Sequence, residues 1–293
     1  MNTVRTLSTA TSEAGETYVL GDAVVTFAVP DRAVMSAVGK ILRGPEGQVV
    51  AHEPHTTVSA RSNGDGWLLE VDGAVVQRLA QRTPAARVAE ELIATACVAV
   101  AGKTNSILIA GAVLTKDGKT LALIGGDLDS ARVIGFHLHA RRWSAIAFRY
   151  AFLSRASLST IGLHSLAVVS SSSIDQMPTR YRPAIEVSLW YDTGFDLAFY
   201  TVDPLVVHSS WLPSTPLTHV VLVDGKIDDE PSLDVGVGPS DARVIGQHAD
   251  AGSLRVARLT LGTPVASCNI LEKWITGAAD APVFSMTHPG AEI

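Results

Sequence analysis

Residues 121–143 read LALIGGDLDSARVIGFHLHARRW, an apolar strand followed by a diglycine, a polar turn and a helix-like pattern. Loops at such strand-to-helix junctions can cradle phosphate groups, because glycines let successive backbone N–H groups approach the oxygens. Phosphoryl transfer also needs a lysine that reaches the β- and γ-phosphates and a hydroxyl that binds Mg²⁺. When Gly125 is aligned with the first glycine of a P-loop, the lysine position holds Ala131 and the hydroxyl position holds Arg132. The residues of this degenerate P-loop are Gly125, Gly126, Asp127, Asp129, Ser130, Ala131 and Arg132.

The acidic residues of this junction work against a nucleotide. Asp127 and Asp129 would repel a triphosphate by about 1 kcal/mol in water and by several in a partly buried loop. The favoured alternative for both is an ordinary helix start, where an aspartate accepts otherwise unbonded N–H groups. For Arg132 two interpretations stand: a solvated position on the helix face, which is the more common one, and direct binding of an anion.

Other clusters of reactive side chains predict neither a metal centre nor a hydrolase site. His137 and His139 lie two residues apart on the expected helix and therefore point in different directions. His52, Glu53 and His55 have no third suitably spaced ligand and fit a surface turn. No G-x-S-x-G pattern occurs, so a nucleophile elbow is not predicted. We expect no metal and no cofactor.

Residues 141–155 combine arginines with aromatic residues at high density. Such mixing is typical of protein interfaces, although a sheet with one solvated face explains it equally well. If 144–153 forms one strand, Phe148, Tyr150 and Phe152 share a face and Arg149 lies opposite. The candidate interface residues are Arg141, Arg142, Trp143, Arg149 and Tyr150.

Composition narrows the class of partner. The chain has 293 residues, of which 47% are hydrophobic and 18% charged, and 23 basic against 29 acidic residues give a net charge of −6. Without a basic stripe or a polybasic segment, we expect neither nucleic acid nor a membrane as partner. The N-terminal residues lack the apolar core of a signal peptide, which predicts a cytoplasmic protein. Cys97 and Cys268 sit in apolar helical contexts and are expected to be buried free thiols.

The elements that must position these residues alternate along the chain. Residues 55–80 read as strands joined at 63–66 and 72–73. A helix is expected after Pro30-Asp31, and a second one begins at Pro84 with Thr83 as its cap. The apolar positions of the second helix fall on one face, which predicts a core helix: Val88, Leu92, Ile93, Ala96 and Cys97. Two β-rich runs flank an Asp-Gly turn at 117–118, which predicts a tight hairpin. Further strands are expected at 164–169, 184–192, 196–203 and 218–225, a loop at 170–173, and helices at 240–252 and 266–277.

This order of elements resembles the HPr kinase/phosphorylase-related group, whose core is shared with phosphoenolpyruvate carboxykinase. The matching pieces are IAGAVLTKDGKTLALIGG, DLDSARVIGFHLHARRW and SAIAFRY, followed by VDPLVVHSSWLPSTPLTHVVLVDG and PSDARVIGQHADAG. The resemblance implies an α/β fold with a mixed-sheet P-loop kinase-like core and a small N-terminal α/β domain. The implied division is a flexible tail at 1–17, the small domain at 18–102 and the core at 103–293.

The chemistry implied by the resemblance is missing position by position. The acidic pair expected at the end of the strand after the P-loop is replaced by Phe148 and Arg149, and the expected histidine of the first hairpin strand falls at Ala110. The first functional hypothesis is therefore a catalytically inactive pseudo-kinase that binds a protein or peptide partner, alone or as a homo-oligomer. The alternative is a divergent phosphotransferase or a repurposed enzyme that uses the same cleft.

Overall fold

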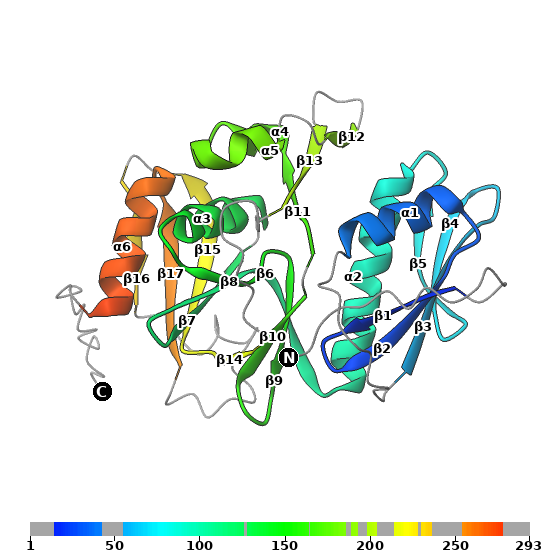
Figure 1. Cartoon of the computed structure of the whole chain (residues 1–293), viewed down its shortest axis with the longest axis horizontal. Coiled ribbons are helices and arrows are strands. Elements are labelled where there is room, and N and C mark those ends of the chain that lie inside the picture. The colour runs from blue at the N-terminus through cyan, green and yellow to red at the C-terminus, as the bar shows by residue number, and fades with distance from the viewer. Residues whose placement is uncertain are drawn as a thin grey trace, which may run out of the picture.

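The computed structural model of this chain describes residues 15–42, 55–125, 128–163, 165–185, 189–192, 198–203, 214–227, 230–235 and 254–277 (Figure 1). It shows a mixed α/β protein with three sheets. The expected helix at 240–252 and most of the expected N-terminal tail lie outside these residues. None of the helices in the described ranges is both long and apolar enough to cross a membrane.

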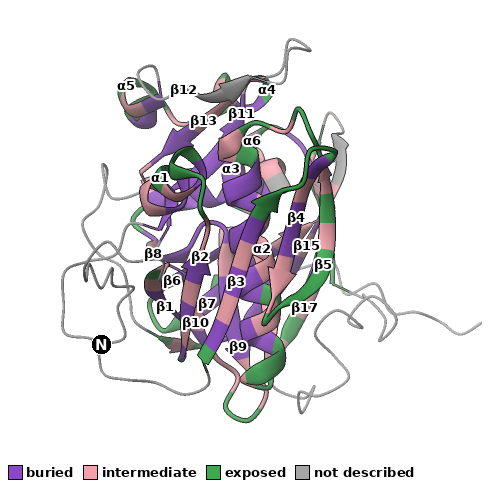
Figure 2. Ribbon diagram, turned by 90° about the vertical axis from the view of Figure 1, so that its right-hand side faces the viewer, coloured by how far each residue is buried: buried purple, intermediate pink, exposed green. Residues whose placement is uncertain are grey.

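The first sheet has five strands in the order β1-β2-β3-β4-β5, all antiparallel except the β2–β3 pair. The turns predicted at 63–66 and 72–73 join β3 to β4 and β4 to β5, as expected for Asn-Gly and Asp-Gly sequences. In Figure 2, β5 forms one edge of this sheet and is exposed or half-exposed along its length. The strands are β1 (Glu16–Leu20), β2 (Ala23–Ala28), β3 (His55–Ser62), β4 (Gly66–Val71) and β5 (Ala74–Ala80).

Two helices complete this part, α1 (Arg32–Ile41) and α2 (Ala85–Lys103). The Asp31 carboxylate accepts the backbone N–H groups of Ala33 and Val34 and so caps α1. The capping prediction for Thr83 is wrong: Pro84 occupies the N-cap position of α2, without a side-chain cap. The predicted apolar face of α2 is confirmed, since Val88, Leu92, Ile93, Ala96 and Cys97 are all fully buried.

The second sheet is built around the predicted hairpin of β6 (Ser106–Lys116) and β7 (Lys119–Gly125). Asp117 and Gly118 have φ angles of 51° and 74°, the conformation of a type I′ turn. Next to β7, the strands β15 (His219–Ile227) and β17 (Arg255–Leu261) run parallel to it, and β16 (Ser232–Asp234) closes that edge. The helices α3 (Leu128–Ala140) and α6 (Pro264–Thr276) share one hydrophobic core with this sheet.

The strand predicted at 144–153 is broken in two, β8 (Ser144–Ala147) and β9 (Tyr150–Ser154). Both pair with β6, but the register shifts between Val113 and Leu114, and residues 148–149 form a bend. The N–H of Gly111 donates to the carbonyl oxygen of Arg149 at this bend, and a Cβ at Gly111 would lie 2.0 Å from the carbonyl oxygen of Leu123 on β7. Beyond β9 the sheet continues through β10 (Ser159–Gly162) to β14 (Thr215–Pro216).

A three-stranded sheet in the order β11-β13-β12 lies at the top of Figure 1. The loop prediction for residues 170–173 is wrong: Ser170 ends β11, and the next serines open a one-turn helix. Residues 184–185, predicted as strand, lie in a helix. The elements are β11 (Ala167–Ser170), α4 (Ser171–Ile174), a 3-10 turn (Thr179–Tyr181), α5 (Arg182–Ile185), β12 (Leu189–Asp192) and β13 (Ala198–Val202).

The buried side chains form separate cores for the first sheet and for the second. α2 ends at Lys103 and β6 begins at Ser106, so the chain passes from the first sheet to the second between these two residues. The core of the first sheet also includes Phe152 and Leu163, which follow β6 in the sequence. The two parts therefore pack directly against each other, with α2 beside the second sheet.

Candidate functional site

A cavity of about 520 Å³ opens at the N-terminal end of α3, between α2 and β11. It lies close to the carboxyl end of β7, in the position where α/β sheets commonly bind ligands. The residues that line it are Arg87, Glu90, Glu91, Ala94, Asp129, Arg132, Arg149, Tyr150, Val168, Ser170, Ser172, Ser173 and Phe199.

The junction that leads into α3 is short. β7 ends at Gly125 and α3 begins at Leu128, so only Gly126 and Asp127, which lie outside the described residues, connect them. Ser130, at the last glycine position of the P-loop pattern, is already helical and half-buried. Ala131, at the lysine position, is fully buried in the core that α3 shares with the sheet.

Asp129 binds the neighbouring β11–α4 junction. Its Oδ2 accepts the backbone N–H of Ser170 at 3.0 Å and the hydroxyl of Ser173 at 3.4 Å. Its Oδ1 accepts a hydrogen bond from Nη1 of Arg132 at 3.2 Å. The carboxylate is therefore part of a polar network that fixes the first turn of α3 against β11.

Arg132 is buried, and the expectation of a solvated position on the helix face is wrong. It is 7% exposed because the first turn of α3 packs against β11. Nη1 also donates to the carbonyl oxygen of Val168 at 2.6 Å, whereas Nε has no hydrogen-bond partner among the described residues. Burial, and then the charge of Arg149, lower the pKa of Arg132, while Asp129 acts in the opposite direction.

Arg149 also lines the cavity and is only 4% exposed. It lies in the bend between β8 and β9. Its Nη1 is 3.7 Å from Oε1 of Glu90, an ion pair too long for a hydrogen bond, and its guanidinium carbon is 5.5 Å from the centre of the Tyr150 ring. Neither Nε nor Nη1 has a hydrogen-bond partner within the described part of the chain.

The acidic residues of α2 are engaged by Arg87. Its Nη1 lies 3.0 Å from Oε2 of Glu90, and its Nη2 pairs with Glu91. Glu91 also accepts a hydrogen bond from the side chain of Gln77 at 3.2 Å. Sequence reasoning missed these residues, although one signal was present: Glu90 is three residues before Ile93 and thus lies on the apolar face of α2.

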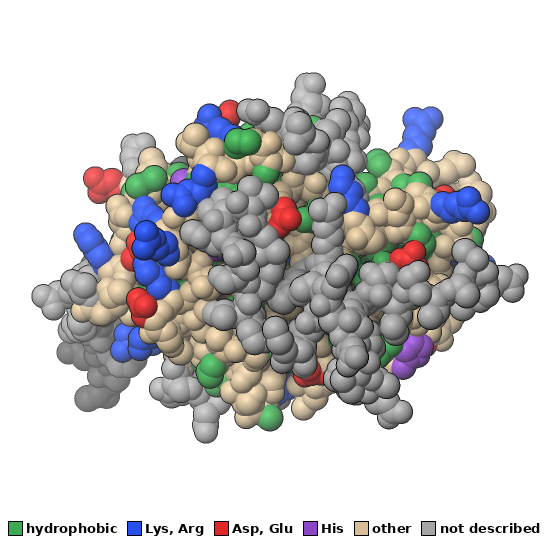
Figure 3. Space-filling view, viewed as in Figure 1, with side chains coloured by type: hydrophobic (Ala, Val, Ile, Leu, Met, Phe, Trp, Pro, Cys, Tyr) green, Lys and Arg blue, Asp and Glu red, His purple; other side chains and the backbone are tan. Residues whose placement is uncertain are grey.

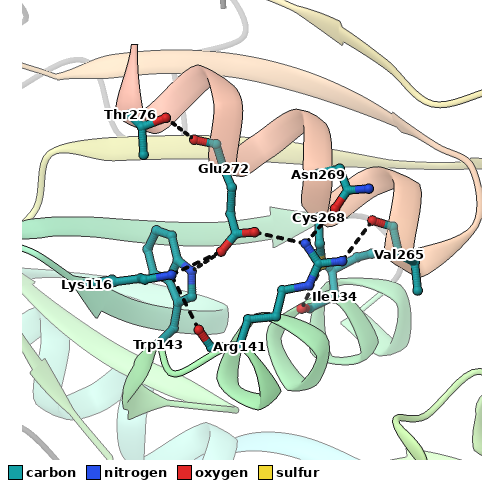
Figure 4. Close-up of polar contacts among 9 residues, drawn as sticks. All are labelled: Lys116, Ile134, Arg141, Trp143, Val265, Cys268, Asn269, Glu272 and Thr276. Atoms are coloured by element: carbon teal, nitrogen blue, oxygen red, sulfur yellow. Dashed lines mark hydrogen bonds and ion pairs between the residues drawn. The ribbon is translucent and has the colours of Figure 1, made fainter. Parts of the chain in front are cut away.

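The predicted interface residues fall into different places. Arg141 and Trp143 point toward α6 and bind Glu272 (Figure 4). Arg142 is exposed, whereas Trp143 and Arg149 are 2% and 4% exposed and so do not belong to the surface. Phe148 and Phe152 belong to different cores, because the bend between β8 and β9 breaks the expected alternation.

The polar cluster around Glu272 fixes α3 to α6. Oε2 of Glu272 accepts a hydrogen bond from Nη1 of Arg141 at 2.9 Å, and Oε1 accepts one from Nε1 of Trp143 at 3.0 Å and one from Lys116 at 3.3 Å. Arg141 also donates to the side chain of Asn269 at 2.7 Å and to the carbonyl oxygen of Val265 at 3.1 Å. Figure 3 shows basic side chains gathered on this side of the molecule, with acidic ones among them.

The remaining candidates do not form a reactive centre. His137 contacts the carbonyl oxygen of Gln176 at 2.7 Å, whereas the buried His139 contacts the hydroxyl of Tyr181, so the two point to different partners as predicted. His52 and Glu53 lie outside the described residues. Among the residues that are described, no group of three or more His, Cys, Asp or Glu side chains could hold a metal ion. Both cysteines are free and buried, as predicted, and burial raises the pKa of each thiol to about 12.

The site is thus an open cavity lined by buried charged side chains in a mixed α/β protein, at the end of a helix that follows a parallel strand. No protein-family model matches the chain, and no curated protein matches it either.

Proposed function

We propose that this chain is a non-catalytic binding protein with a kinase-type core of the HPr kinase/phosphoenolpyruvate carboxykinase kind, which acts through a protein or peptide partner. The observation that carries the proposal is the burial of Ala131 and Arg132. A kinase needs a cation and a hydroxyl that face the nucleotide at these positions. Here the first side chain lies in the core, and the second donates to Val168 and Asp129 inside the protein.

The early start of α3 supports the same conclusion. A P-loop surrounds the phosphates with the backbone N–H groups of a non-helical loop that continues to its lysine. In this chain the helix begins at Leu128, three residues before the lysine position. The connection after β7 is therefore too short to wrap around a triphosphate.

The exposed edge of the first sheet supports a protein or peptide partner. β5 ends the strand order, and its Val75 and Val76 are 45% and 54% exposed. An exposed apolar edge strand presents unpaired backbone groups to which a partner strand, or a second copy of the chain, can add. This is where we expect the partner to bind.

Titration calorimetry with Mg-ATP tests the loss of kinase function. We expect no binding at millimolar nucleotide and no release of inorganic phosphate. Titration without Mg²⁺ is the control, because a working P-loop site binds the Mg²⁺ complex. Micromolar affinity that depends on Mg²⁺ would overturn the proposal and favour a divergent phosphotransferase.

A charge on the edge strand tests the partner. Val76→Lys should weaken self-association in sedimentation velocity, or the binding of an isolated partner, by about tenfold, because a lysine on an edge strand opposes strand addition. Val265→Lys is the matched control, since Val265 is 52% exposed on α6, which packs on the second sheet. Equal effects of the two variants would show that the partner does not bind at β5.

A repurposed enzyme is the second candidate function, and the cavity between α2 and α3 is the observation that favours it. Its volume of about 520 Å³ is within the range of small-molecule sites. Turnover of a ligand that occupies this cavity would distinguish an enzyme from a binding protein.

A further inference from the structure

We propose that the cavity between α2 and α3 binds a small oxyanion, a carboxylate or a phosphate, between the guanidinium groups of Arg149 and Arg132. This inference does not depend on the protein or peptide partner proposed above. It starts from hydrogen-bond donors that the described part of the chain leaves unused.

The carboxylates around the cavity already have partners. Glu90 and Glu91 are engaged by Arg87, and Asp129 accepts from Arg132, Ser170 and Ser173. The Arg149 side chain has the long ion pair with Glu90 and lies over the Tyr150 ring, but its Nε and Nη1 make no hydrogen bond to any described residue. Since Nε carries one N–H and Nη1 two, three of the five donors of this guanidinium are available for an acceptor.

Burial makes these unused donors costly. Buried polar groups in proteins are almost always hydrogen-bonded, and a buried charge without such bonds is strongly disfavoured. Arg149 is 4% exposed and Arg132 is 7% exposed, and both line the cavity. An anion would accept hydrogen bonds from the Nε groups of both side chains and from Nη1 of Arg149.

The two guanidiniums also act on each other. The charge of Arg149 is, after burial, the largest cause that lowers the pKa of Arg132. Two like charges that interact at a buried position are stabilised by a negative group between them. Oxyanions suit this arrangement, because guanidinium groups bind the two oxygens of a carboxylate or phosphate in parallel.

The other walls of the cavity indicate what the anion carries. Ser172 and Ser173 place hydroxyl groups near the arginines, and Ala94, Val168 and Phe199 contribute apolar surface. A small organic acid or phosphate ester, with a short apolar portion, matches this lining. The volume of about 520 Å³ leaves room for such a group beyond the anion itself.

Titration of the full chain with simple anions tests this inference. Sodium phosphate and sodium succinate are added separately, without Mg²⁺, at constant ionic strength set with chloride. We expect at least one of them to raise the melting temperature saturably, with a millimolar or lower dissociation constant. Succinate alone indicates a carboxylate ligand and phosphate alone a phosphate ligand, whereas no saturable effect of either overturns the inference.

Substitutions locate the binding. Arg149→Met should weaken the anion at least tenfold, whereas Arg180→Met, which removes an exposed arginine on the 3-10 turn, should leave it unchanged. Arg149→Lys keeps the charge but loses the planar fork and should weaken binding less than Arg149→Met does. Undiminished binding by Arg149→Met would overturn the inference.

A spectroscopic measurement decides the question if Arg149→Met does not fold. The Nε–H signals of the arginines in the ¹⁵N-labelled wild-type chain are followed during the titration and assigned with Arg132→Lys and Arg149→Lys. We expect the signals of Arg132 and Arg149 to move together, with the dissociation constant obtained from the melting-temperature titration. Unmoved signals would overturn the inference. Because these titrations contain no nucleotide, their failure leaves the tests with Mg-ATP and with Val76→Lys unaffected.

Discussion

The two ends of α3 carry the same types of side chain and use them in opposite ways. At its C-terminal end, Arg141 is a quarter exposed and makes three hydrogen bonds to α6. At its N-terminal end the cavity holds Arg149, whose side chain is 5% exposed and whose Nε and Nη1 make no hydrogen bond to a described residue. Selection for stability alone favours the reverse, because an unsatisfied charge costs most where water is excluded. The cluster at the C-terminal end therefore has the properties of a structural brace, and the cavity has those of a binding site.

The largest expected effect tests how tightly the N-terminal end of α3 is packed. Ala131→Lys should lower the free energy of unfolding by about 3 kcal/mol, because it places a long charged side chain in a filled core. Ala140→Lys, at the half-exposed C-terminal end, is the control and should cost less than about 1 kcal/mol. Urea denaturation measures both. If Ala131→Lys is as stable as the wild type, the lysine position is open and a P-loop remains feasible there.

Acid should lower the free energy of unfolding through His219, which lies where α6 contacts β15. His219 is buried against Trp274 of α6, with ring centres 4.9 Å apart, and burial, followed by the charges of Arg255 and Lys119, lowers its pKa to about 4. An unfolded histidine has a pKa near 6.5, so between pH 6.5 and 4 the unfolded state binds the extra proton. The free energy of unfolding should therefore fall by about 1.4 kcal/mol per pH unit in this window, or about 3 kcal/mol in total.

Two histidine variants isolate this contribution. His219→Phe keeps the aromatic contact with Trp274 and should remove most of the pH dependence between pH 6.5 and 4. His55→Phe, on the exposed start of β3, should retain it. Urea titrations at several pH values measure the slopes, and an unchanged slope in His219→Phe would contradict the assignment.

A matched pair of substitutions compares the two arginines directly. Arg141→Met should lower the free energy of unfolding by about 2 kcal/mol, because it removes hydrogen bonds to a charged partner. Arg149→Met should lower it by less, because Glu90 loses only a long ion pair and keeps its pairing with Arg87. Thermal and urea unfolding in chloride buffer measure both. If the two variants are destabilised equally, the Glu272 cluster and the cavity do not differ as a structural cluster and a binding site.

The smallest expected effect concerns Glu272. Burial tends to raise its pKa, but hydrogen bonds from Trp143 and Arg141 and the charge of Lys116 outweigh burial, so the net shift is downward from 4.5. The stabilisation is therefore present above pH 4.5 and is lost as the pH falls through the lower folded-state value. Glu272→Gln should cost about 1 kcal/mol at pH 7, and its difference from the wild type should shrink by pH 3. A difference that stays constant with pH would argue against the charge as its source.

Much of the local structure could be predicted from the sequence. Asp117-Gly118 indicated the hairpin, Asp31 the start of α1, and the spacing of apolar residues the buried face of α2. These features depend on interactions between residues a few positions apart, so the local pattern contains the information. The division into an N-terminal sheet and a kinase-like core remains a prediction.

The sequence by itself determined that residues 131 and 132 hold neither the lysine nor the hydroxyl of a P-loop, and that an arginine occupies position 149. It did not reveal where these arginines point. Only the tertiary structure decided that Arg149, in the bend that follows β8, is buried and lines the cavity, and that α2, nearly sixty residues earlier in the chain, supplies Glu90 as its ion-pair partner. The physical reason is that burial and hydrogen bonding of a charge depend on segments distant in sequence, whereas turns, caps and helix faces depend on neighbours.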